Sequence, residues 1–264
     1  MNPMIGKELR QRMRERRGWI LPSLYLLVLG AVITIPYYEM TRQSYRELQG
    51  FEIGVALFIT AAYTQLSLLL LLAPVFSAGA LTIEKEQRTL SGLLTSLLGP
   101  LQIWWGKFVA SLLYVLLLLV AGLPVVSVAF AFGGVGAWEV GIATFTTTVI
   151  LATISAISLY WSSAFRRSVH ATAVSYVTVI VMTLVTFVVF VIGAATVNHG
   201  PWTELPVAVQ APLYFNPVFF LTMAFQPMDK LYPEWLTCLA VFILLGVLCV
   251  LLTLRNLYRS GDVV

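Results

Sequence analysis

Long uncharged apolar runs are the feature that most constrains what this chain can fold into. Six of them are long enough, at ~17–25 residues, to cross the hydrocarbon core of a bilayer as α-helices. They lie near residues 19–37, 54–78, 108–131, 139–163, 171–195 and 235–254. None contains a Lys, Arg or Asp, and a charge at a helix centre would cost ~2.5–3.5 kcal/mol on insertion scales. The runs lack the alternation of barrel strands, so the sequence predicts an all-α polytopic membrane protein with six transmembrane helices.

The overall composition agrees with this fold class. Of the 264 residues, 59% are hydrophobic and only 11% are charged, whereas a soluble domain carries about 25% charged residues. The chain therefore has too few charges to cover a soluble surface, and we expect the lipid bilayer to be one of its partners.

The distribution of basic residues predicts the orientation. If both termini are cytoplasmic, all but three of the 16 Lys and Arg residues lie on the cytoplasmic side, the exceptions being Arg42, Arg46 and Lys230. This is the positive-inside pattern and argues for an even number of spans. The net charge of +4 then reflects topology and contact with anionic lipids. Nucleic acid is excluded as a partner, because the basic residues are spread over four cytoplasmic pieces.

The N-terminal segment, residues 1–18, is predicted to be an amphipathic helix lying in the cytoplasmic interface. Ile5, Leu9 and Met13 recur every four residues, and basic side chains line another face. Such a pattern is typical of a helix with its apolar face in the membrane. The alternative is a solvated basic tail.

The outer connection, residues 196–234, is rich in proline and yet apolar. Asn216 is a good N-cap and Pro217 suits the first helical position. The apolar stretch from Pro217 to Phe225 is too short to span. We expect a re-entrant segment between the fifth and sixth spans, the alternative being an external loop that lies flat on the bilayer.

The charged segment between the second and third spans, residues 81–100, is predicted to be an amphipathic cytoplasmic helix. Thr82 could cap it, and Glu84 and Glu86 would favour its positive end. Glu84 could pair with Arg88 across one turn, and Gly99 and Pro100 would end the helix.

This helix could simply lie on the membrane, or it could present its charges to a soluble partner. Acids are repelled by an anionic membrane surface, which favours the partner. A row of leucines at helical spacing would anchor the other face; these are Leu90, Leu93, Leu94 and Leu97.

The stretch "IEKEQRTLSGLLTSLLGPLQIWWGKFVASLLYVLLLL" resembles the segment after the second span of ABC-2-type (type V) ABC transporter permeases. The matching positions are Glu84, Glu86, Thr89 and Leu90, followed by "GK" before the third span. The opening "NPMIGKELRQRMR" and the turn "SSAFRRS" are also similar to that family, and the likeness covers essentially the whole chain. "LLGPLQIWW" departs from it, because many members have a Pro-x-Ser-Arg-like turn there.

The resemblance implies a permease subunit of an ABC exporter in the bacterial inner membrane. Residues 81–100 would be the coupling helix, docking into a separate ATPase subunit present in two copies, and the N-terminal helix would touch the same subunit. The expected contact residues are Glu84, Glu86, Arg88, Thr89, Leu90 and Leu93. A second permease copy, identical or related, would complete a dimer.

The chain itself is not expected to be an enzyme or to bind a cofactor. It has no G-x-x-x-x-G-K-[S/T] phosphate loop, so ATP and Mg would be bound by the partner subunit. No metal site is expected either, since His170 and His199 would lie at opposite membrane faces.

Polar side chains at membrane depth are candidates for a substrate pathway, because the resemblance implies that spans two and five of paired subunits enclose it. They are Tyr63, Gln65, Ser175, Thr178, Met182 and Thr186. The alternative is that they act as polar contacts between helices. The lack of charge within the spans argues against a proton relay or an ion channel and favours an apolar or amphipathic substrate such as a lipid, a lipid-linked molecule or a drug.

Two other functions compete with transport. The chain could be an energy-transducing or scaffold subunit of an envelope machine that carries no substrate itself. It could also be an intramembrane enzyme, which the lack of any acid, base or metal constellation within the spans disfavours.

Overall fold

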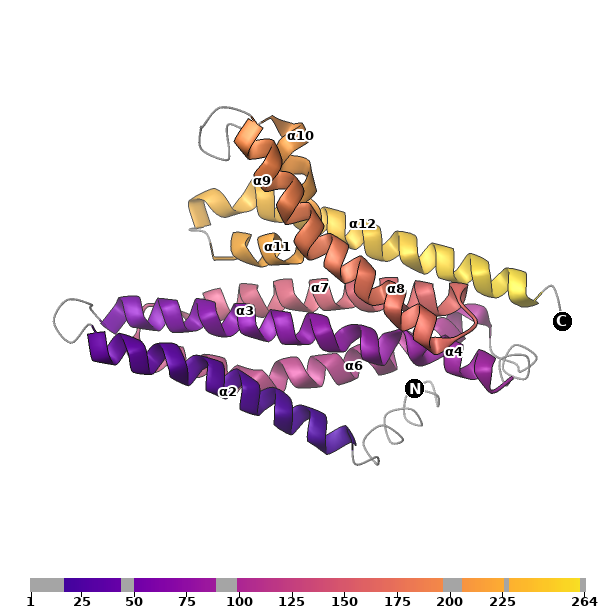
Figure 1. The fold of residues 1–264 in the computed structure, drawn as a ribbon, viewed down its shortest axis with the longest axis horizontal. Helices are drawn as coiled ribbons and strands as arrows, with labels where there is room; N and C mark the ends of the chain where they lie inside the picture. The colour runs from indigo at the N-terminus through magenta and orange to yellow at the C-terminus, as the bar shows by residue number, and fades with distance from the viewer. Residues whose placement is uncertain (1–16, 44–49, 89–98, 197–205, 226–227, 262–264) are drawn as a thin grey trace.

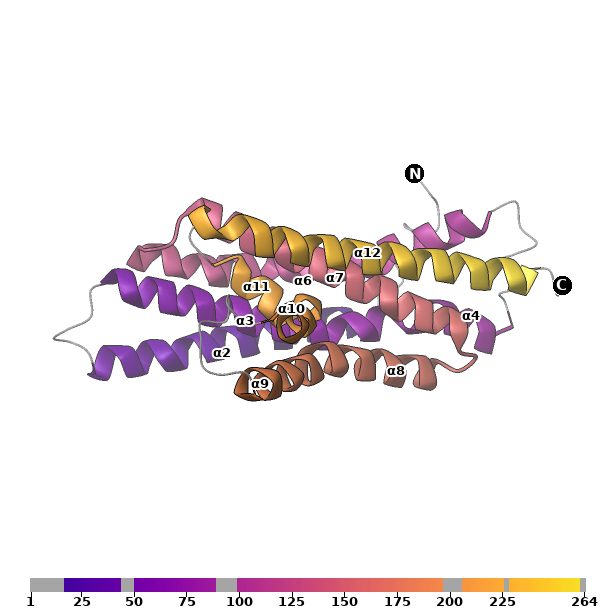
Figure 2. The same cartoon turned by 90° about the horizontal axis from the view of Figure 1, so that it is seen from above.

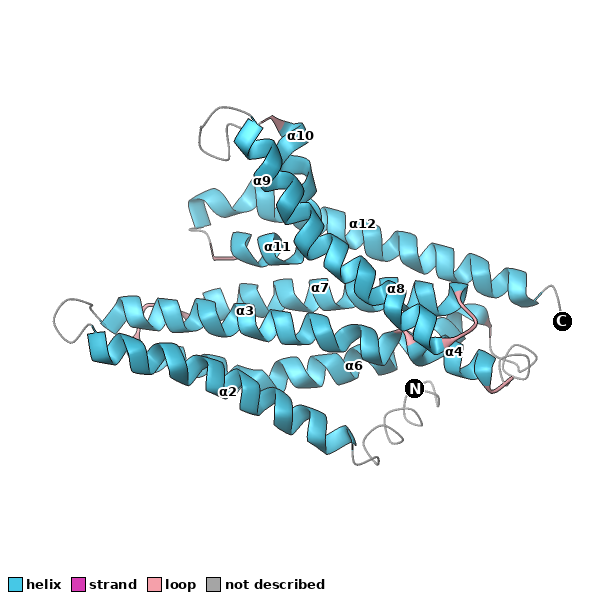
Figure 3. Cartoon of the chain, viewed as in Figure 1, coloured by secondary structure: helices cyan, strands magenta, loops and turns pink. Residues whose placement is uncertain are grey.

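The computed structural model describes residues 17–43, 50–88, 99–196, 206–225 and 228–261. Within these ranges every regular element is helical and none is a strand (Figure 3). The predicted all-α class is therefore confirmed for the described part of the chain.

The elements follow one another from α2 to α12 (Figure 1). They are α2 (Arg17–Gln43), α3 (Gly50–Ser77), α4 (Gly79–Glu86), α6 (Pro100–Ser127), the 3₁₀ turn η1 (Val128–Phe132), α7 (Ala137–Ala164), α8 (Ser168–Ile180), the π-helical segment η2 (Val181–Val185), α9 (Thr186–Thr196), α10 (Val207–Gln210), the 3₁₀ turn η4 (Ala211–Phe215), α11 (Pro217–Met223) and α12 (Met228–Gly261).

Five described helical stretches are long and apolar enough to cross a membrane, and they match the second to sixth predicted runs. They are Gly54–Glu86, Leu101–Phe132, Ala137–Ala164, Ser168–Thr196 and Pro233–Tyr258. The first predicted run falls in α2, whose described apolar stretch, Ile20–Ile35, is shorter. The chain is thus an integral membrane protein with several apolar helices.

α3 lies at the centre of the bundle, packed against α2, α6 and α7, and α12 runs along α7 (Figures 1 and 2). The core contains fully buried side chains from several of these helices; among them are Leu29, Leu66, Leu118, Ile150 and Phe242. Small hydroxyl residues of α7 are buried too, such as Thr146 and Ser155, as expected where helices pack closely in lipid.

Ser168–Thr196, which matches the fifth predicted span, is the least buried of the five described stretches. Its first part, α8, packs against α7, α4 and α3, whereas α9 leans away from the bundle and packs against η4 and α10 (Figure 1). Its outer surface carries exposed Val177, Leu184, Val188 and Ile192. An apolar surface of this length must face lipid or another chain.

Two boundaries predicted for the charged segment are wrong. α4 begins at Gly79, so Thr82 lies inside it and its hydroxyl donates to the carbonyl of Ala78 (3.2 Å). Gly99 is the N-cap of α6 and Pro100 its first residue, so this pair starts a helix. The cause is an ambiguity of proline, which suits a first helical turn as well as the residues that follow a helix.

Parts of three predicted special segments lie outside the described residues. Of the predicted N-terminal helix, only the last two residues are described, and they belong to α2. Residues 89–98, which include Thr89, Leu90 and Leu93, lie outside the described residues. In the outer connection, residues 206–225 are described, and they confirm the predicted cap. Asn216 accepts from the amides of Val218 (2.8 Å) and Phe219 (3.2 Å), with Pro217 at the first position of α11.

The contact between α3 and η1 depends on Gly54. A Cβ at Gly54 would collide with the backbone carbonyl oxygen of Gly133, which has a left-handed φ of 82°. Backbone cannot move aside as a flexible side chain can, so we expect Gly54→Ala to destabilise the fold by about 1–3 kcal/mol. Thermal unfolding in detergent measures this. The control is Gly30→Ala, whose Cβ would meet nothing within 4 Å, and an equal loss in both variants would contradict the prediction.

Candidate functional site

Three described charges of the predicted coupling segment, Glu84, Lys85 and Glu86, lie on α4, at one end of the bundle (Figures 1 and 2). α4 contacts α6, α7 and α8 and continues from α3. Its apolar face, Ala80 and Leu81, packs in a small cluster with Trp104, Leu159 and Leu257. Four spans therefore meet around this short helix.

The start of α4 is bound to the end of α7. Pro74 lies inside α3, and a proline has no amide hydrogen and disturbs the turn that precedes it. α3 ends three residues later, and α4 starts at Gly79. Ser162 Oγ accepts hydrogen bonds from the amides of Leu81 (2.9 Å) and Thr82 (3.1 Å). A side chain of α7 thus supports the backbone at this junction.

Lys85 caps the C-terminus of α7. Its ammonium donates to the carbonyls of Ser162 (3.2 Å), Ser163 and Phe165 (3.0 Å). The last carbonyls of a helix have no partner within the helix and carry its negative end. A cation at this position satisfies both needs.

Glu86 caps the N-terminus of α8. Its carboxylate accepts hydrogen bonds from the amide (2.6 Å) and the hydroxyl (2.9 Å) of Ser168, the first residue of α8. The N-cap residue itself, Arg167, makes no side-chain cap. An anion is favoured at the positive end of a helix, so α4 supplies the cap that α8 lacks. Lys85 and Glu86 together hold both sides of the α7–α8 turn, and we call this pair the turn clamp.

Glu84 binds a third element, α6. Its carboxylate lies 3.2 Å from the Lys107 ammonium, and Lys107 is almost fully buried. The predicted pair of Glu84 with Arg88 is therefore wrong. α4 ends at Glu86, and Arg88 has left the helical path with a φ of 57°.

The structure thus gives intrachain partners to two of the residues predicted to contact an ATPase, Glu84 and Glu86. It also adds residues that the sequence reasoning missed, namely Lys85, Lys107, Ser162 and Ser168. The signal that could have found them was the need for caps at the ends of α7 and α8, close to a short run of mixed charge. The predicted ATPase contact itself stays a prediction.

The predicted pathway residues of α3 face different neighbours. Gln65 is buried and donates to the carbonyl of Leu119 in α6 (2.9 Å). The Tyr63 hydroxyl lies 2.8 Å from that of Thr222 in α11. The two side chains therefore do not join one polar surface within this chain.

The four predicted pathway residues of the fifth span, Ser175, Thr178, Met182 and Thr186, contact the chain's own interior. Ser175 and Met182 are buried. Thr178 accepts a hydrogen bond from the indole of Trp161 (3.0 Å), and Thr186 accepts one from the amide of Asn216 (3.0 Å). These contacts match the alternative of polar packing between helices, and a role in a pathway stays a prediction.

The fold and the site define a class: a helical membrane protein in which a short charged helix at one end of the bundle binds the ends of several spans. The sequence model of the ABC-2 family transporter protein matches residues 3–257. The chain belongs to this family of ABC transporter permeases, which are membrane transport components that work with ABC ATPase subunits. No curated protein matches the chain.

Removing the cation of the turn clamp should weaken the α7–α8 turn. Lys85→Met leaves three carbonyls without their charged donor, and hydrogen bonds to charged groups contribute about 1.5–3 kcal/mol. We expect a lower melting temperature and faster amide hydrogen exchange in residues 164–169. Arg88→Met, three residues away on an exposed side chain, is the control and should change neither. Unchanged exchange in Lys85→Met would show that the clamp does not stabilise the turn.

Proposed function

We propose that the chain is the transmembrane permease subunit of an ABC exporter, driven by a separate ATPase subunit present in two copies. That partner binds ATP and Mg, and this chain binds neither. A second permease, identical or related, completes the assembly. Membership of the ABC-2 family supports this proposal.

In this proposal the chain has six spans in the bacterial inner membrane, with both termini in the cytoplasm. α2 supplies the first span, because its 27 residues reach about 40 Å as a helix and it packs beside α3. The positive-inside rule supports the orientation, because basic residues gather around α4. Lys85 lies on α4 and Arg88 just after it, Lys107 pairs with Glu84, Arg166 lies in the α7–α8 turn that Lys85 caps, and Arg255 is two residues before Leu257, which packs on α4. α11, short and packed against α12 and α7, is the re-entrant element of the outer half.

The turn clamp is the observation that carries the proposal. Lys85 and Glu86 bind the end of α7 and the start of α8, so a force applied to α4 acts on the fifth span at its first residue. An ATPase that pushes on α4 therefore moves a span directly. Movement of α8 would pass through η2 into α9, which leans out of the bundle.

The exported substrate is proposed to be apolar or amphipathic, such as a lipid, a lipid-linked molecule or a hydrophobic drug. None of the five described apolar stretches holds a charged residue in its central part. The exposed apolar surface of α8 and α9 is the place where a second permease copy would pack and enclose the pathway.

One observation favours the alternative, an energy-transducing subunit that carries no substrate. The hydroxyl and amide groups proposed to line a pathway are already bonded within the chain, as in Gln65, Thr178 and Thr186. A chain that only transmits movement needs no free polar groups at membrane depth. If the complex required a further envelope protein for its activity, that requirement would identify the chain as such an energy-transducing subunit.

Reversing the two acids of α4 tests the docking surface. We expect Glu84→Lys/Glu86→Lys to lose the ATPase subunit that co-purifies with the tagged wild-type chain in mild detergent, because the partner meets repulsive charge. Mass spectrometry of the purified complex measures the stoichiometry.

Two controls separate docking from an indirect effect on the fold. Lys107→Met removes the partner of Glu84, and Ser168→Ala removes one donor to Glu86, while α4 keeps both acids. Both controls should retain the ATPase. Full retention by the double mutant would refute the docking assignment, and equal loss in the controls would show that the acids act through the fold alone.

A further inference from the structure

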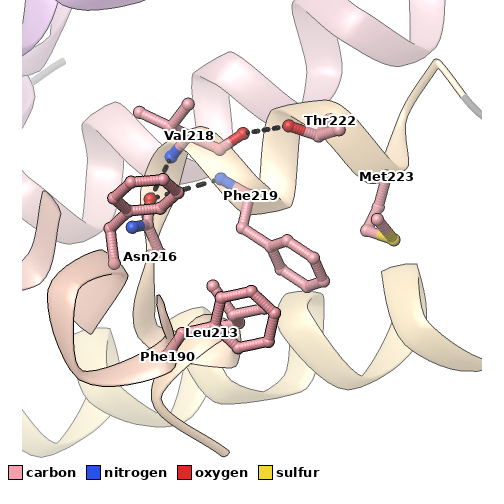
Figure 4. A pocket seen from close by; sticks show the side chains of 8 residues that line it. Phe190, Leu213, Asn216, Val218, Phe219, Thr222 and Met223 are labelled. Atoms are coloured by element: carbon pink, nitrogen blue, oxygen red, sulfur yellow. Dashed lines mark hydrogen bonds between the residues drawn. The ribbon is translucent and has the colours of Figure 1, made fainter. Parts of the chain in front are cut away.

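A cavity of about 340 Å³ opens between α9, η4 and α11. It falls within the ~300–1,000 Å³ of small-molecule sites, and it exceeds the ~150 Å³ engineered cavity that binds benzene. Figure 4 shows its lining, which is apolar except for Asn216 and Thr222. The other lining residues are Phe187, Phe190, Leu213, Val218, Phe219 and Met223.

Asn216 fixes the wall of this cavity. Its side-chain oxygen accepts from two amides of α11 (Figure 4). Its amide nitrogen donates to the carbonyl of Thr183 (2.9 Å), within η2, and to the hydroxyl of Thr186 (3.0 Å). A π-helical turn displaces a helix from regular bonding and is often found at functional sites. Asn216 joins this turn to α11 and keeps the two sides of the cavity at a fixed separation.

Among the described residues that line the cavity, both polar side chains are already hydrogen-bonded. Asn216 uses its oxygen and its amide nitrogen in the four bonds just described. The Thr222 hydroxyl donates to the carbonyl of Val218 (2.8 Å) and lies 2.8 Å from that of Tyr63. None of the lining residues that the structure describes is charged. The cavity therefore suits a purely apolar group and not a headgroup, a sugar or an ion.

The mouth of the cavity continues into the exposed apolar surface of the chain. At its rim Phe187 is 55% exposed and Val218 is 37% exposed. α9 and α11 lie away from α4, towards the other end of the bundle (Figure 1). In a membrane-spanning chain, the part of such a surface that no second chain covers meets the hydrocarbon tails of the surrounding lipid.

We propose that this cavity binds one acyl chain of a bilayer phospholipid, with the headgroup outside it. The inference requires only that the chain is embedded in a bilayer, and it goes beyond the proposed transport function. An acyl chain there would fill the space between α9 and α11 and would support the separation that Asn216 sets.

The experiment uses the full chain in nanodiscs of phosphatidylethanolamine and phosphatidylglycerol, with a trace of phospholipid that carries a diazirine in its acyl chain. After irradiation, adducts are mapped by peptide mass spectrometry. The reference is α12, where Leu244 and Leu251 are 67% and 61% exposed. If labelling followed exposure alone, α12 would be labelled more than residues 213–223. We expect at least a fivefold preference for 213–223.

A cavity-filling variant and a matched control complete the test. Val218→Trp places an indole at the rim and should reduce the preference at least fivefold. Val207→Trp makes the same change on α10, at a highly exposed residue outside the lining, and should leave the preference unchanged. Melting temperature and monodispersity check that both variants are folded. Labelling of 213–223 no stronger than that of α12 in the wild-type chain would overturn the proposal, whether or not Val218→Trp folds.

Discussion

The capping of helix ends at one end of the bundle determines how α4, α7 and α8 are arranged. Within the bilayer each backbone group is bonded inside its own helix, but the last carbonyls of α7 and the first amides of α8 need partners from elsewhere. Lys85 and Glu86, adjacent on α4, supply a cation to one end and an anion to the other. Both charges match the helix dipoles that they meet. The position of α4 and the geometry of the α7–α8 turn therefore depend on each other.

A second hydrogen-bonded contact between elements lies further along the fifth span. Asn216 caps α11 and binds the π-helical turn η2 with the other end of its amide. The fifth span is thus attached at its start to α4 and at its middle to α11, while much of its surface stays exposed. This largely exposed helix is held by polar contacts with α4, with Trp161 of α7 and with α11, so a movement of α4 would act on it directly. The cavity between α9 and α11 lies next to the second attachment.

The second to sixth predicted spans match long apolar helices of the described residues, because charge exclusion over ~20 residues is a direct requirement of the bilayer. The sequence also predicted the cap at Asn216, because Asn followed by Pro strongly indicates the start of a helix. It failed for Thr82, because the start of α4 is set by Pro74 and by Ser162 of a distant helix. It failed for Gly99 and Pro100, because proline suits a first helical turn as well as the residues that follow a helix. Sequence periodicity does not encode tertiary packing. It therefore could not predict which face of the fifth span is buried, or that Glu84 pairs with Lys107 and not with Arg88.

From the turn clamp we infer that α4 and the start of α8 would move as one body if an ATPase subunit acted on α4. Double electron–electron resonance measures this directly, as the distance between spin labels at Gln87 and Val169, both exposed. Cys238 and Cys249 are replaced by alanine, and the ATPase subunit is bound. A second label pair, Val169 and Ile20 of α2, reports movement relative to the bundle. If α4 and α8 move as one body, ATP changes the Val169–Ile20 distance and leaves the Gln87–Val169 distance unchanged. A change in the Gln87–Val169 distance, with the other pair constant, would contradict it.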